Sequence, residues 1–286
     1  MPLLRPAASP PPRYHSVEVA EVEPVAEHAV SLAFDVSSPE LASYLDYVAG
    51  QYVTLDCTID GERVRQSYSL WTRPARARAE GRLRIAVAEI AGGRMSPWLF
   101  SHVAAGDRID LLPPRGDFTY AAQPGHARHV VVAGGSGITP VLAIIAEILA
   151  ADAANEVDVV LANRTRASSV LRDEVAALEA SFAGRLRVVD VLSREPAPAA
   201  GDASWGSGVG AARHERIDAQ LLDELVGDGA ESVEGWWLCG PQGLLEVSEA
   251  WLGTRGIPEG RVHRERFTTT GPVDPRPPVG ADQRRS

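Results

Sequence analysis

Apolar and polar residues alternate with the two-residue period of a β-strand between residues 14 and 120 of the chain. Turn-forming pairs, Asp60-Gly61 and Gly92-Gly93, separate some of the alternating segments. One short helix is expected, Ser96–Val103, with Ser96 as its N-cap and Pro97 at its first position. Many short strands without long helices predict an antiparallel barrel or sandwich. The expected strands are His15–Val22, Ala29–Val36, Tyr52–Ile59, Val64–Trp71 and Arg82–Glu89.

The pattern changes after Gln123-Pro124-Gly125. Short apolar runs now alternate with segments of helical periodicity, which are about 10 to 15 residues long. This alternation predicts a parallel, doubly wound sheet with helices on its faces. The expected strands are His129–Ala133, Val157–Ala162, Leu186–Leu192 and Trp236–Cys239, and the expected helices are one that starts near Pro140, then Val170–Phe182, Ile217–Val226 and Leu244–Arg255.

The two patterns divide the chain into a β domain at residues 14–123 and an α/β domain at residues 124–267, and a length of 286 residues suits two domains. Residues 1–13 are rich in Pro and Ala, and we expect a mobile tail there. Residues 268–286 contain four prolines and are expected to be disordered. Glu195–Ala212, which is rich in Pro, Ala, Gly and Ser, is expected to be a surface loop.

Composition and charge exclude several classes of protein. The net charge is 28 − 38 = −10, which argues against a general nucleic-acid binder. All basic residues are Arg, so no lysine Schiff base can form. The longest apolar run, Ile138–Ala151, contains Glu147 and is shorter than the roughly 20 residues of a membrane span. The N-terminal segment lacks the apolar region of a signal peptide, so a cytoplasmic location is expected. With Cys57 and Cys239 as the two cysteines, no disulfide framework, four-cysteine zinc site or iron–sulfur cluster is expected on this chain, and we assign no metal site.

A glycine-rich turn, Gly134-Gly135-Ser136-Gly137-Ile138-Thr139-Pro140, joins the first strand of the α/β domain to its first helix. Glycines in this position let the backbone approach a pyrophosphate, and the helix N-terminus supplies amide groups. Pro140 suits the first helical turn because its missing N–H group would have no partner there. The alternative is a tight connection without a ligand, but the strand before and the helix after favour binding.

Two further motifs end strands of the same domain. Asn163-Arg164-Thr165-Arg166 follows the second strand, with Ser168 and Arg172 close behind, and a cationic cluster at this sheet edge can meet a 2′-phosphate. The alternative is an Arg-rich solvated turn. Cys239-Gly240-Pro241 ends the last predicted strand, and a thiol in that place is more often part of the core than reactive.

The β domain contains two notable motifs, Arg65-Gln66-Ser67-Tyr68-Ser69-Leu70 and Gly92-Gly93-Arg94-Met95-Ser96. The second has the composition of a phosphate-binding loop, with flexible glycines, an arginine and a serine that opens a helix. The alternatives are that Tyr68 is an ordinary strand aromatic and that Ser96 is only a helix cap.

Taken in this order, the motifs resemble the ferredoxin–NADP+ reductase superfamily over residues 14–267, most of all the oxygenase reductases of the phenylacetyl-CoA epoxidase type. The resemblance implies an antiparallel Greek-key FAD-binding barrel followed by a Rossmann-like, doubly wound NADP-binding domain. It implies that Ser69, Thr139 and Cys239 shape the contact between nicotinamide and flavin. The FAD-binding residues that it implies are Arg65, Gln66, Tyr68, Ser69, Gly92, Gly93, Arg94, Met95, Ser96 and Phe267. The implied NADP-binding residues are Gly135, Gly137, Thr139, Pro140, Asn163, Arg164, Thr165, Arg166, Ser168, Cys239, Gly240 and Pro241.

The chain departs from this family pattern in two places. The family has Arg-x-Tyr-Ser, whereas Gln66 stands two residues before Tyr68 here and Arg65 lies one step earlier. A shift by one residue turns a strand side chain to the other face unless a bulge intervenes, so either Arg65 or Arg94 with backbone amides binds the FAD pyrophosphate. The epoxidase-type reductases also continue into a four-cysteine ferredoxin domain, and the cysteine ligands of such a domain are not found in this sequence. Electrons are therefore expected to leave the flavin for another molecule.

The resemblance implies an FAD-dependent reductase that takes hydride from NADPH and passes single electrons to a separate acceptor. The acceptor is expected to be an acidic 2Fe-2S ferredoxin or an oxygenase component. From Arg63 to Arg94 the sequence holds eight arginines against Glu80 and Glu89, a local charge of 8 − 2 = +6, and this run is a predicted docking surface unless it is only a solvated hairpin. Two alternatives are an NAD(P)H:flavin reductase that acts on free flavin or small acceptors and a non-catalytic FAD- or nucleotide-binding regulatory subunit. The intact Thr139-Pro140 and Cys239-Gly240-Pro241 motifs argue against the second alternative.

Overall fold

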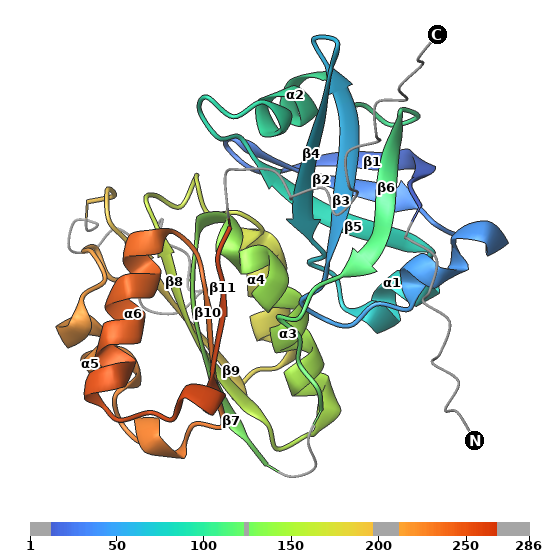
Figure 1. Cartoon of the computed structure of the whole chain (residues 1–286). Helices are drawn as coiled ribbons and strands as arrows, with labels where there is room; N and C mark the ends of the chain where they lie inside the picture. Colours follow the sequence, from blue (N-terminus) through green and yellow to red (C-terminus); the bar gives the residue numbers. More distant parts are fainter. Residues whose placement is uncertain (1–12, 123–125, 197–211, 268–286) are drawn as a thin grey trace, which may run out of the picture.

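Alternating residues in the first half of the chain form six antiparallel strands, and most of their buried apolar side chains join one core. The computed structural model describes residues 13–122, 126–196 and 212–267. The strand order is β4-β3-β6-β1-β2-β5, and an antiparallel bridge between Leu70 and Ile85 brings the two sheet edges together (Figure 1). The predicted antiparallel barrel is confirmed. Its strands are β1 His15–Ala26, β2 Ala29–Asp35, β3 Tyr52–Ile59, β4 Glu62–Ser69, β5 Arg82–Ala88 and β6 Arg108–Arg115.

Three short helices accompany the barrel strands: η1 Pro39–Leu45, α1 Pro74–Glu80 and α2 Met95–His102. The predicted helix at residues 96–103 is confirmed with a shift of one residue, but the prediction that Ser96 is its N-cap is wrong. Arg94 occupies the N-cap position, and Ser96 lies inside the first turn. The Ser96 hydroxyl instead accepts a hydrogen bond from the Ile90 backbone N–H (3.1 Å), which ties the preceding loop to the helix.

The second half of the chain forms a five-stranded parallel sheet in the order β11-β10-β7-β8-β9. Helices α3 and α4 cover one face and helices α5 and α6 the other, so the predicted doubly wound sheet is confirmed (Figure 1). Neighbouring residues of β7 serve the two faces: Val131 packs with α3, whereas Val130 and Val132 pack with α5 and α6. The strands are β7 Arg128–Gly134, β8 Glu156–Asn163, β9 Leu186–Leu192, β10 Gly235–Cys239 and β11 Val262–Glu265. The helices are η2 Gly135–Gly137, α3 Ile138–Ala151, α4 Arg172–Ser181, α5 Ala219–Val226, η3 Ala230–Ser232, α6 Gln242–Thr254 and η4 Glu259–Arg261.

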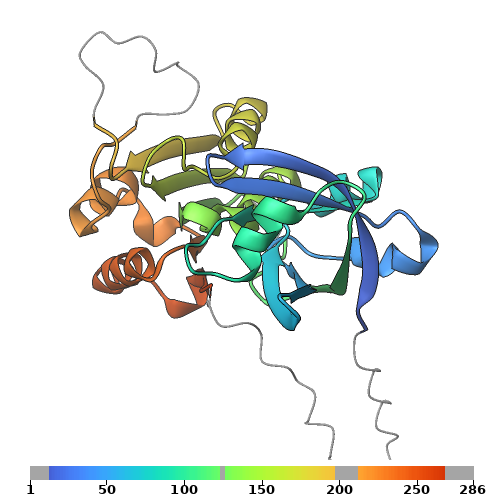
Figure 2. The same cartoon turned by 90° about the horizontal axis from the view of Figure 1, so that it is seen from above.

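The face covered by α3 and α4 packs directly against the barrel. Barrel residues Ala49 and Trp71 belong to the same buried cluster as α3. The tip of the β1–β2 hairpin reaches α4 (Figure 2), and the backbone N–H of Leu171 there donates to the Val25 carbonyl (3.2 Å). Arg73, which precedes α1, forms an ion pair with Glu147 of α3 (2.6 Å). The two halves therefore share a core and polar contacts.

Several predicted segments lie wholly or mostly outside the described residues. These are the boundary between residues 123 and 124, the C-terminal tail, nearly all of the N-terminal tail and most of the Glu195–Ala212 loop. Among the helices in the described part of the chain, all are too short or too polar to cross a membrane.

The arginine-rich run from Arg63 to Arg94 does not form one basic surface. Its residues are spread from the β3–β4 hairpin to α1, which lie at opposite ends of the barrel (Figure 1). Seven of its eight arginines have a carboxylate within 4 Å, and the eighth, Arg78, donates to the Leu45 carbonyl. Most of the partners come from outside the run, so the charge counted along the sequence is largely compensated in the fold. The paired arginines are Arg63, Arg65, Arg73, Arg76, Arg82, Arg84 and Arg94.

Candidate functional site

A cavity of about 430 Å³ lies between the barrel and the α/β domain. Its size falls in the range of roughly 300 to 1,000 Å³ that is typical of small-molecule and cofactor sites. The barrel contributes residues of β3, β4, β5 and the loop before α2, and the α/β domain contributes the N-terminus of α3 and the end of β11. The sequence-predicted residues that line it are Gln66, Tyr68, Ser69, Gly93, Arg94, Met95, Ser96, Thr139 and Phe267.

The cavity wall formed by β4 presents an aromatic ring and a hydroxyl. Tyr68 pairs with Val53 in the β3–β4 ladder, and Ser69, which ends the strand, is 5% exposed. Burial raises the pKa of the Tyr68 phenol, so this side chain is neutral at physiological pH. A flat neutral ring beside a buried hydroxyl suits a planar, partly polar ring system such as isoalloxazine.

The loop before α2 forms the rim of the same cavity. Gly92 adopts a positive φ of 76°, and the N–H of Gly93 donates to the Ile90 carbonyl (2.9 Å). The Arg94 guanidinium is held at this rim by Glu62 (2.5 Å) and by the carbonyl of Ile59 (3.3 Å). An exposed cation beside a glycine turn can receive a pyrophosphate.

Arg65 lies on the opposite face of β4 from Gln66 and Tyr68. It stands across from Asp56 in the ladder, and its Nε donates to the Asp56 carboxylate (2.8 Å). Gln66 lines the cavity, as do Ser67 and Ser69 farther along β4, whereas the Arg65 guanidinium is turned toward Asp56. Of the two arginines considered for the pyrophosphate, Arg94 is thus the one at the cavity.

The glycine-rich turn after β7 is shaped by a close backbone approach. A Cβ atom on Gly137 would lie 2.2 Å from the Cys239 carbonyl oxygen, so only glycine fits against the Cys239-Gly240-Pro241 turn. Gly135 has a φ of 55°, and its N–H donates to the Asn163 side chain (3.1 Å). The sequence-predicted Gly135, Gly137, Thr139, Pro140, Asn163, Cys239, Gly240 and Pro241 therefore lie together around the start of α3.

The start of α3 faces the cavity. Ser136 and Thr139 line it, and the Thr139 hydroxyl donates to the Ser136 carbonyl (2.9 Å). The positive end of the helix dipole favours a phosphate at this position. The turn thus suits the pyrophosphate of a pyridine nucleotide whose nicotinamide enters the cavity.

The loops after β8 and β9 meet at the carboxyl edge of the sheet. Arg164 is exposed in the first loop, where Thr165 and Ser168 hydrogen-bond each other (3.1 Å). Arg194, also exposed, follows β9, and its backbone N–H donates to the Arg164 carbonyl (2.8 Å). The sequence analysis missed Ser193 and Arg194, although their place directly after a strand of the parallel sheet was a usable signal.

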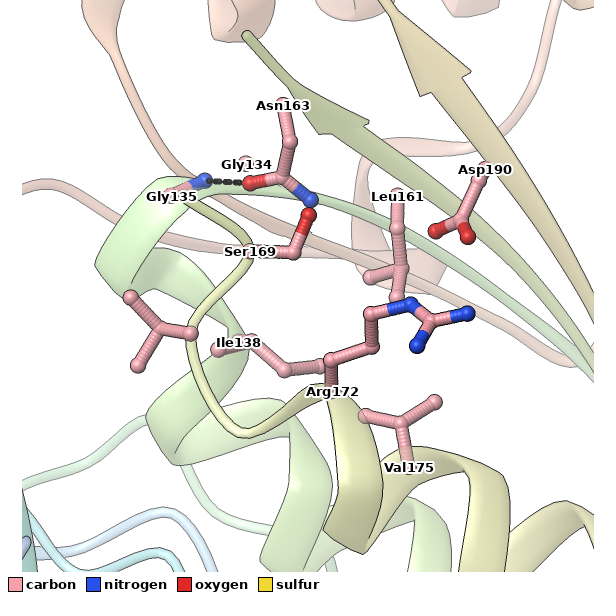
Figure 3. A pocket seen from close by; sticks show the side chains of 10 residues that line it. Gly134, Gly135, Ile138, Leu161, Asn163, Ser169, Arg172, Val175 and Asp190 are labelled. Atoms are coloured by element: carbon pink, nitrogen blue, oxygen red, sulfur yellow. Dashed lines mark hydrogen bonds between the residues drawn. The ribbon is translucent and has the colours of Figure 1, made fainter. Parts of the chain in front are cut away.

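A second cavity, of about 10 Å³, lies beneath this edge and is too small for a nucleotide. Figure 3 shows Asn163 and Ser169 at its upper side and Arg172 and Asp190 facing each other across it. Asp190 is 1% exposed, and burial raises the pKa of its carboxyl while Arg166 and Arg172 lower it. A pyridine nucleotide does not fit beneath this edge, and the buried groups there support the loops.

Glu265 is a site residue that the sequence analysis did not include in its assignments. It ends β11, lines the large cavity and stands opposite Cys239 in the parallel ladder. Burial raises the pKa of the Glu265 carboxyl to about 7, and its Oε2 atom has no hydrogen-bond partner within the described ranges. Burial also raises the pKa of the Cys239 thiol well above its usual value, so the thiol is neutral. The signal available in the sequence was the Glu265-Arg266-Phe267 segment, which resembles the family segment that returns to the flavin at the end of the domain.

Family models match both halves of the chain. The model described as an oxidoreductase FAD-binding domain matches residues 16–120, and the one described as an oxidoreductase NAD-binding domain matches residues 131–249. These matches agree with the barrel cavity and the glycine-rich turn.

Curated relatives are similar over most of the chain. It is 32% identical over 264 residues to a subunit of 1,2-phenylacetyl-CoA epoxidase from Escherichia coli, covering 90% of this chain and 69% of that protein. It is 32% identical over 238 residues to the reductase subunit of an aromatic O-demethylase from Amycolatopsis, covering 80% of this chain and 63% of that protein. The chain thus spans about two thirds of the length of these relatives.

A solved structure supports the same assignment. The flavohem-like FAD/NAD-binding domain of nitric oxide dioxygenase from Vibrio cholerae superposes with a TM-score of 0.70 at 25% identity, covering 91% of this chain and all of that domain. The matching domain models, the similarity to the epoxidase subunit and the shared fold lead to one conclusion: this chain belongs to the ferredoxin–NADP+ reductase superfamily and is an NAD(P)H-dependent FAD flavoprotein reductase.

Proposed function

We propose that this reductase takes hydride from NADPH and passes electrons one at a time to a separate protein, an oxygenase component or a 2Fe-2S ferredoxin. The observation that carries the proposal is the large cavity, where β4 and the loop before α2 meet the N-terminus of α3 and the end of β11. When bound, FAD supplies the chemistry, since it accepts a hydride and releases single electrons.

Different barrel residues bind different parts of FAD. Tyr68 and Ser69 provide a ring and a hydroxyl for the isoalloxazine, and the loop Gly92–Ser96 with Arg94 provides the pyrophosphate site. Phe267, which is 43% exposed at the cavity mouth, covers the side of the cavity opposite these barrel residues. FAD burial would thereby shield an aromatic ring that is otherwise open to water.

Two exposed arginines support NADPH over NADH. Arg164 and Arg194 lie at one sheet edge, joined by a backbone hydrogen bond of 2.8 Å, and within the described part of the chain neither guanidinium forms an ion pair. A 2′-phosphate placed there would gain charge-assisted hydrogen bonds that a 2′-hydroxyl cannot.

Some residues around the reacting atoms position the nicotinamide, and one of them can hold or release a proton. Three buried, neutral side chains orient the nicotinamide without placing a charge beside the reacting atoms: Thr139, Cys239 and Ser69. Glu265 is the group whose pKa of about 7 allows it to hold or release a proton at the cavity wall.

The acceptor is proposed from the relatives and from the cysteine content. The similar proteins include an epoxidase subunit and the reductase subunit of an O-demethylase. Both cysteines of this chain are buried, singly placed and far apart, so they cannot ligate a 2Fe-2S cluster here. The compensated charges on Arg63–Arg94 give little support to electrostatic docking on that run. The mouth of the flavin cavity is therefore the proposed docking face.

An anaerobic visible spectrum of the purified protein, recorded before and after addition of NADPH or NADH, tests this function. A bound-flavin band that bleaches faster with NADPH supports it. A band that neither nucleotide bleaches supports a regulatory subunit, and flavin lost on desalting supports a reductase of free flavin. Absence of flavin, with none taken up from added FAD, contradicts all three.

A further inference from the structure

The Arg166 side chain, unlike those of Arg164 and Arg194, lies beside a carboxylate of the loop after β9, that of Glu195. The Arg166 backbone N–H donates to Glu195 Oε2 (2.6 Å), and its Nε lies 3.8 Å from Glu195 Oε1. The two side chains are 23% and 19% exposed. Arg164 and Arg194, by contrast, are exposed.

The charge of Arg166 also acts on a second, buried carboxylate. Asp190 of β9 is 1% exposed, and the charges of Arg166 and Arg172 both act on it. Asp190 and Arg172 line the small cavity beneath the loop (Figure 3). The charge of Arg166 thus acts on two carboxylates, Glu195 from the loop and Asp190 from the sheet.

We propose that Glu195 and Asp190 hold Arg166 out of the nucleotide phosphate site, so that Arg166 is a positioning residue and Glu195 limits the preference for NADPH. The proposal rests on the proposed function, in which the 2′-phosphate is bound by Arg164 and Arg194. It replaces the expectation from the sequence that Arg166 itself binds NADP.

The charges explain the expected effects. An arginine paired with a half-buried carboxylate must lose that pair before it meets a phosphate, which removes most of the gain. Glu195 also places a negative charge near the bound 2′-phosphate, while it leaves a 2′-hydroxyl nearly unaffected. Arg166 therefore stabilises the loop for any adenine nucleotide, whereas Glu195 weakens the binding of nucleotides with a 2′-phosphate.

The test measures dissociation constants of 2′,5′-ADP and 5′-AMP, which report the adenosine end without hydride transfer. The FAD-loaded protein is compared with Arg164→Ala, Arg166→Ala and Glu195→Gln. Glu215→Gln serves as a matched control, since Glu215 is an exposed carboxylate paired with Arg213. The informative quantity is the ratio of the two dissociation constants, because a merely structural effect weakens the binding of both ligands alike.

Arg166→Ala is expected to weaken both ligands by the same factor and to leave their ratio within about twofold. Glu195→Gln is expected to raise the preference for 2′,5′-ADP about tenfold, the value of one charge-assisted contact. Glu215→Gln should change neither constant. A tenfold loss of the preference in Arg166→Ala, or an unchanged ratio in Glu195→Gln, overturns the proposal.

Failure of the proposed function gives a different result. In that case the unmodified protein binds 2′,5′-ADP no more tightly than 5′-AMP, and Arg164→Ala changes nothing. The positioning role of Arg166 is then still tested by 5′-AMP alone. If Arg166 positions the loop, Arg166→Ala must weaken the binding of 5′-AMP. If Arg166→Ala does not fold, Glu195→Gln decides the proposal by itself.

Discussion

Glu265 and Cys239 stand opposite each other in the parallel ladder between β11 and β10, at the carboxyl edge of the sheet. The thiol is completely buried, and the carboxyl lines the cavity between the domains. Cys239 in turn borders Gly137 of the nucleotide turn. A proton-holding carboxyl, a neutral thiol and the phosphate-binding turn are thus placed by three adjacent strands of one sheet.

Glu265→Gln is predicted to change how stability depends on pH. The folded-state pKa of about 7 lies above the ordinary value of 4.5, so the folded protein keeps a proton that the unfolded chain has already lost. Stability therefore falls as pH rises from about 4.5 to 7, by on the order of 3 kcal/mol in total. Glutamine cannot ionise and removes this loss. Urea midpoints should be similar for the two proteins at pH 4.5 and higher for Glu265→Gln at pH 8.

The control for this prediction is Glu249→Gln, whose carboxylate pairs with Arg264 and Arg266 beside the same strand. It should not gain stability at pH 8, because it loses ion pairs instead of a buried charge. Parallel pH curves for the unmodified protein and Glu265→Gln would show that Glu265 has an ordinary pKa.

Gly137→Ala is predicted to damage nucleotide binding and stability together. The backbone φ of −61° is acceptable for alanine, but its Cβ would lie 2.2 Å from the Cys239 carbonyl oxygen and 2.8 Å from the Gly240 nitrogen. Relief of this overlap must push the turn away from β10, at a cost of about 1 to 3 kcal/mol or more. The melting temperature should fall and the KM for NADPH should rise.

Gly243→Ala is the matched control, since its Cβ would have no atom within 4 Å and the residue lies in helix α6. Alanine there should be neutral or stabilising by up to about 1 kcal/mol. The same behaviour in both variants would mean that the Gly137 contact with Cys239 does not constrain the turn.

Arg164→Ala and Arg194→Ala are each predicted to lower the ratio of kcat/KM for NADPH to that for NADH by about tenfold, because each removes a charge-assisted contact to the 2′-phosphate. The values for NADH should stay nearly constant. Arg187→Ala is a suitable control, since that exposed residue of β9 pairs with Asp158 away from the carboxyl edge. Steady-state kinetics with both nucleotides checks the ratio, and an unchanged ratio in both variants would leave the preference without its proposed basis.

It was predictable that an antiparallel sheet comes first in the chain and a parallel sheet second, because the periodicity of apolar residues follows directly from which faces are buried. Tyr52–Ile59 and Leu186–Leu192 even have the predicted bounds. Strand β6 was missed because Pro113-Pro114 argues against a strand, and the structure accommodates the two prolines at an irregularity of the β3–β6 ladder. Helix α1 was missed because its residues are arginines and small alanines without an apolar stripe.

The glycine motifs of the site were predictable because their chemistry is local, whereas the roles of the arginines were not. Arg65 is engaged by Asp56 and Arg166 by Glu195, and each partner lies on another strand or loop. The sequence shows that an arginine is present, but an ion pair with a distant carboxylate decides where its charge is directed. The raised pKa of Glu265 could not be predicted for a similar reason, since it comes from burial by elements remote in the sequence.

Arg94→Ala and Arg65→Ala are predicted to separate FAD binding from stability. Arg94 stands at the cavity, so its loss should raise the dissociation constant for FAD about tenfold or more. Arg65 faces Asp56, whose side chain is 2% exposed, so its loss leaves a buried carboxylate with Arg63 as its other ion-pair partner. That change should cost about 1 to 3 kcal/mol of stability and leave FAD binding nearly unchanged.

Titration of the apoprotein with FAD, followed by flavin fluorescence, measures the first effect, and urea denaturation measures the second. Arg63→Ala is the control, since its guanidinium pairs with the same Asp56 but its side chain is 57% exposed, and it should cost less than Arg65→Ala. If Arg65→Ala loosens FAD while Arg94→Ala does not, Arg65 must leave Asp56 and reach the pyrophosphate from the other face of β4. The shift of the arginine by one residue from the family pattern would then be compensated by a movement of the side chain, instead of by a second cation at the rim.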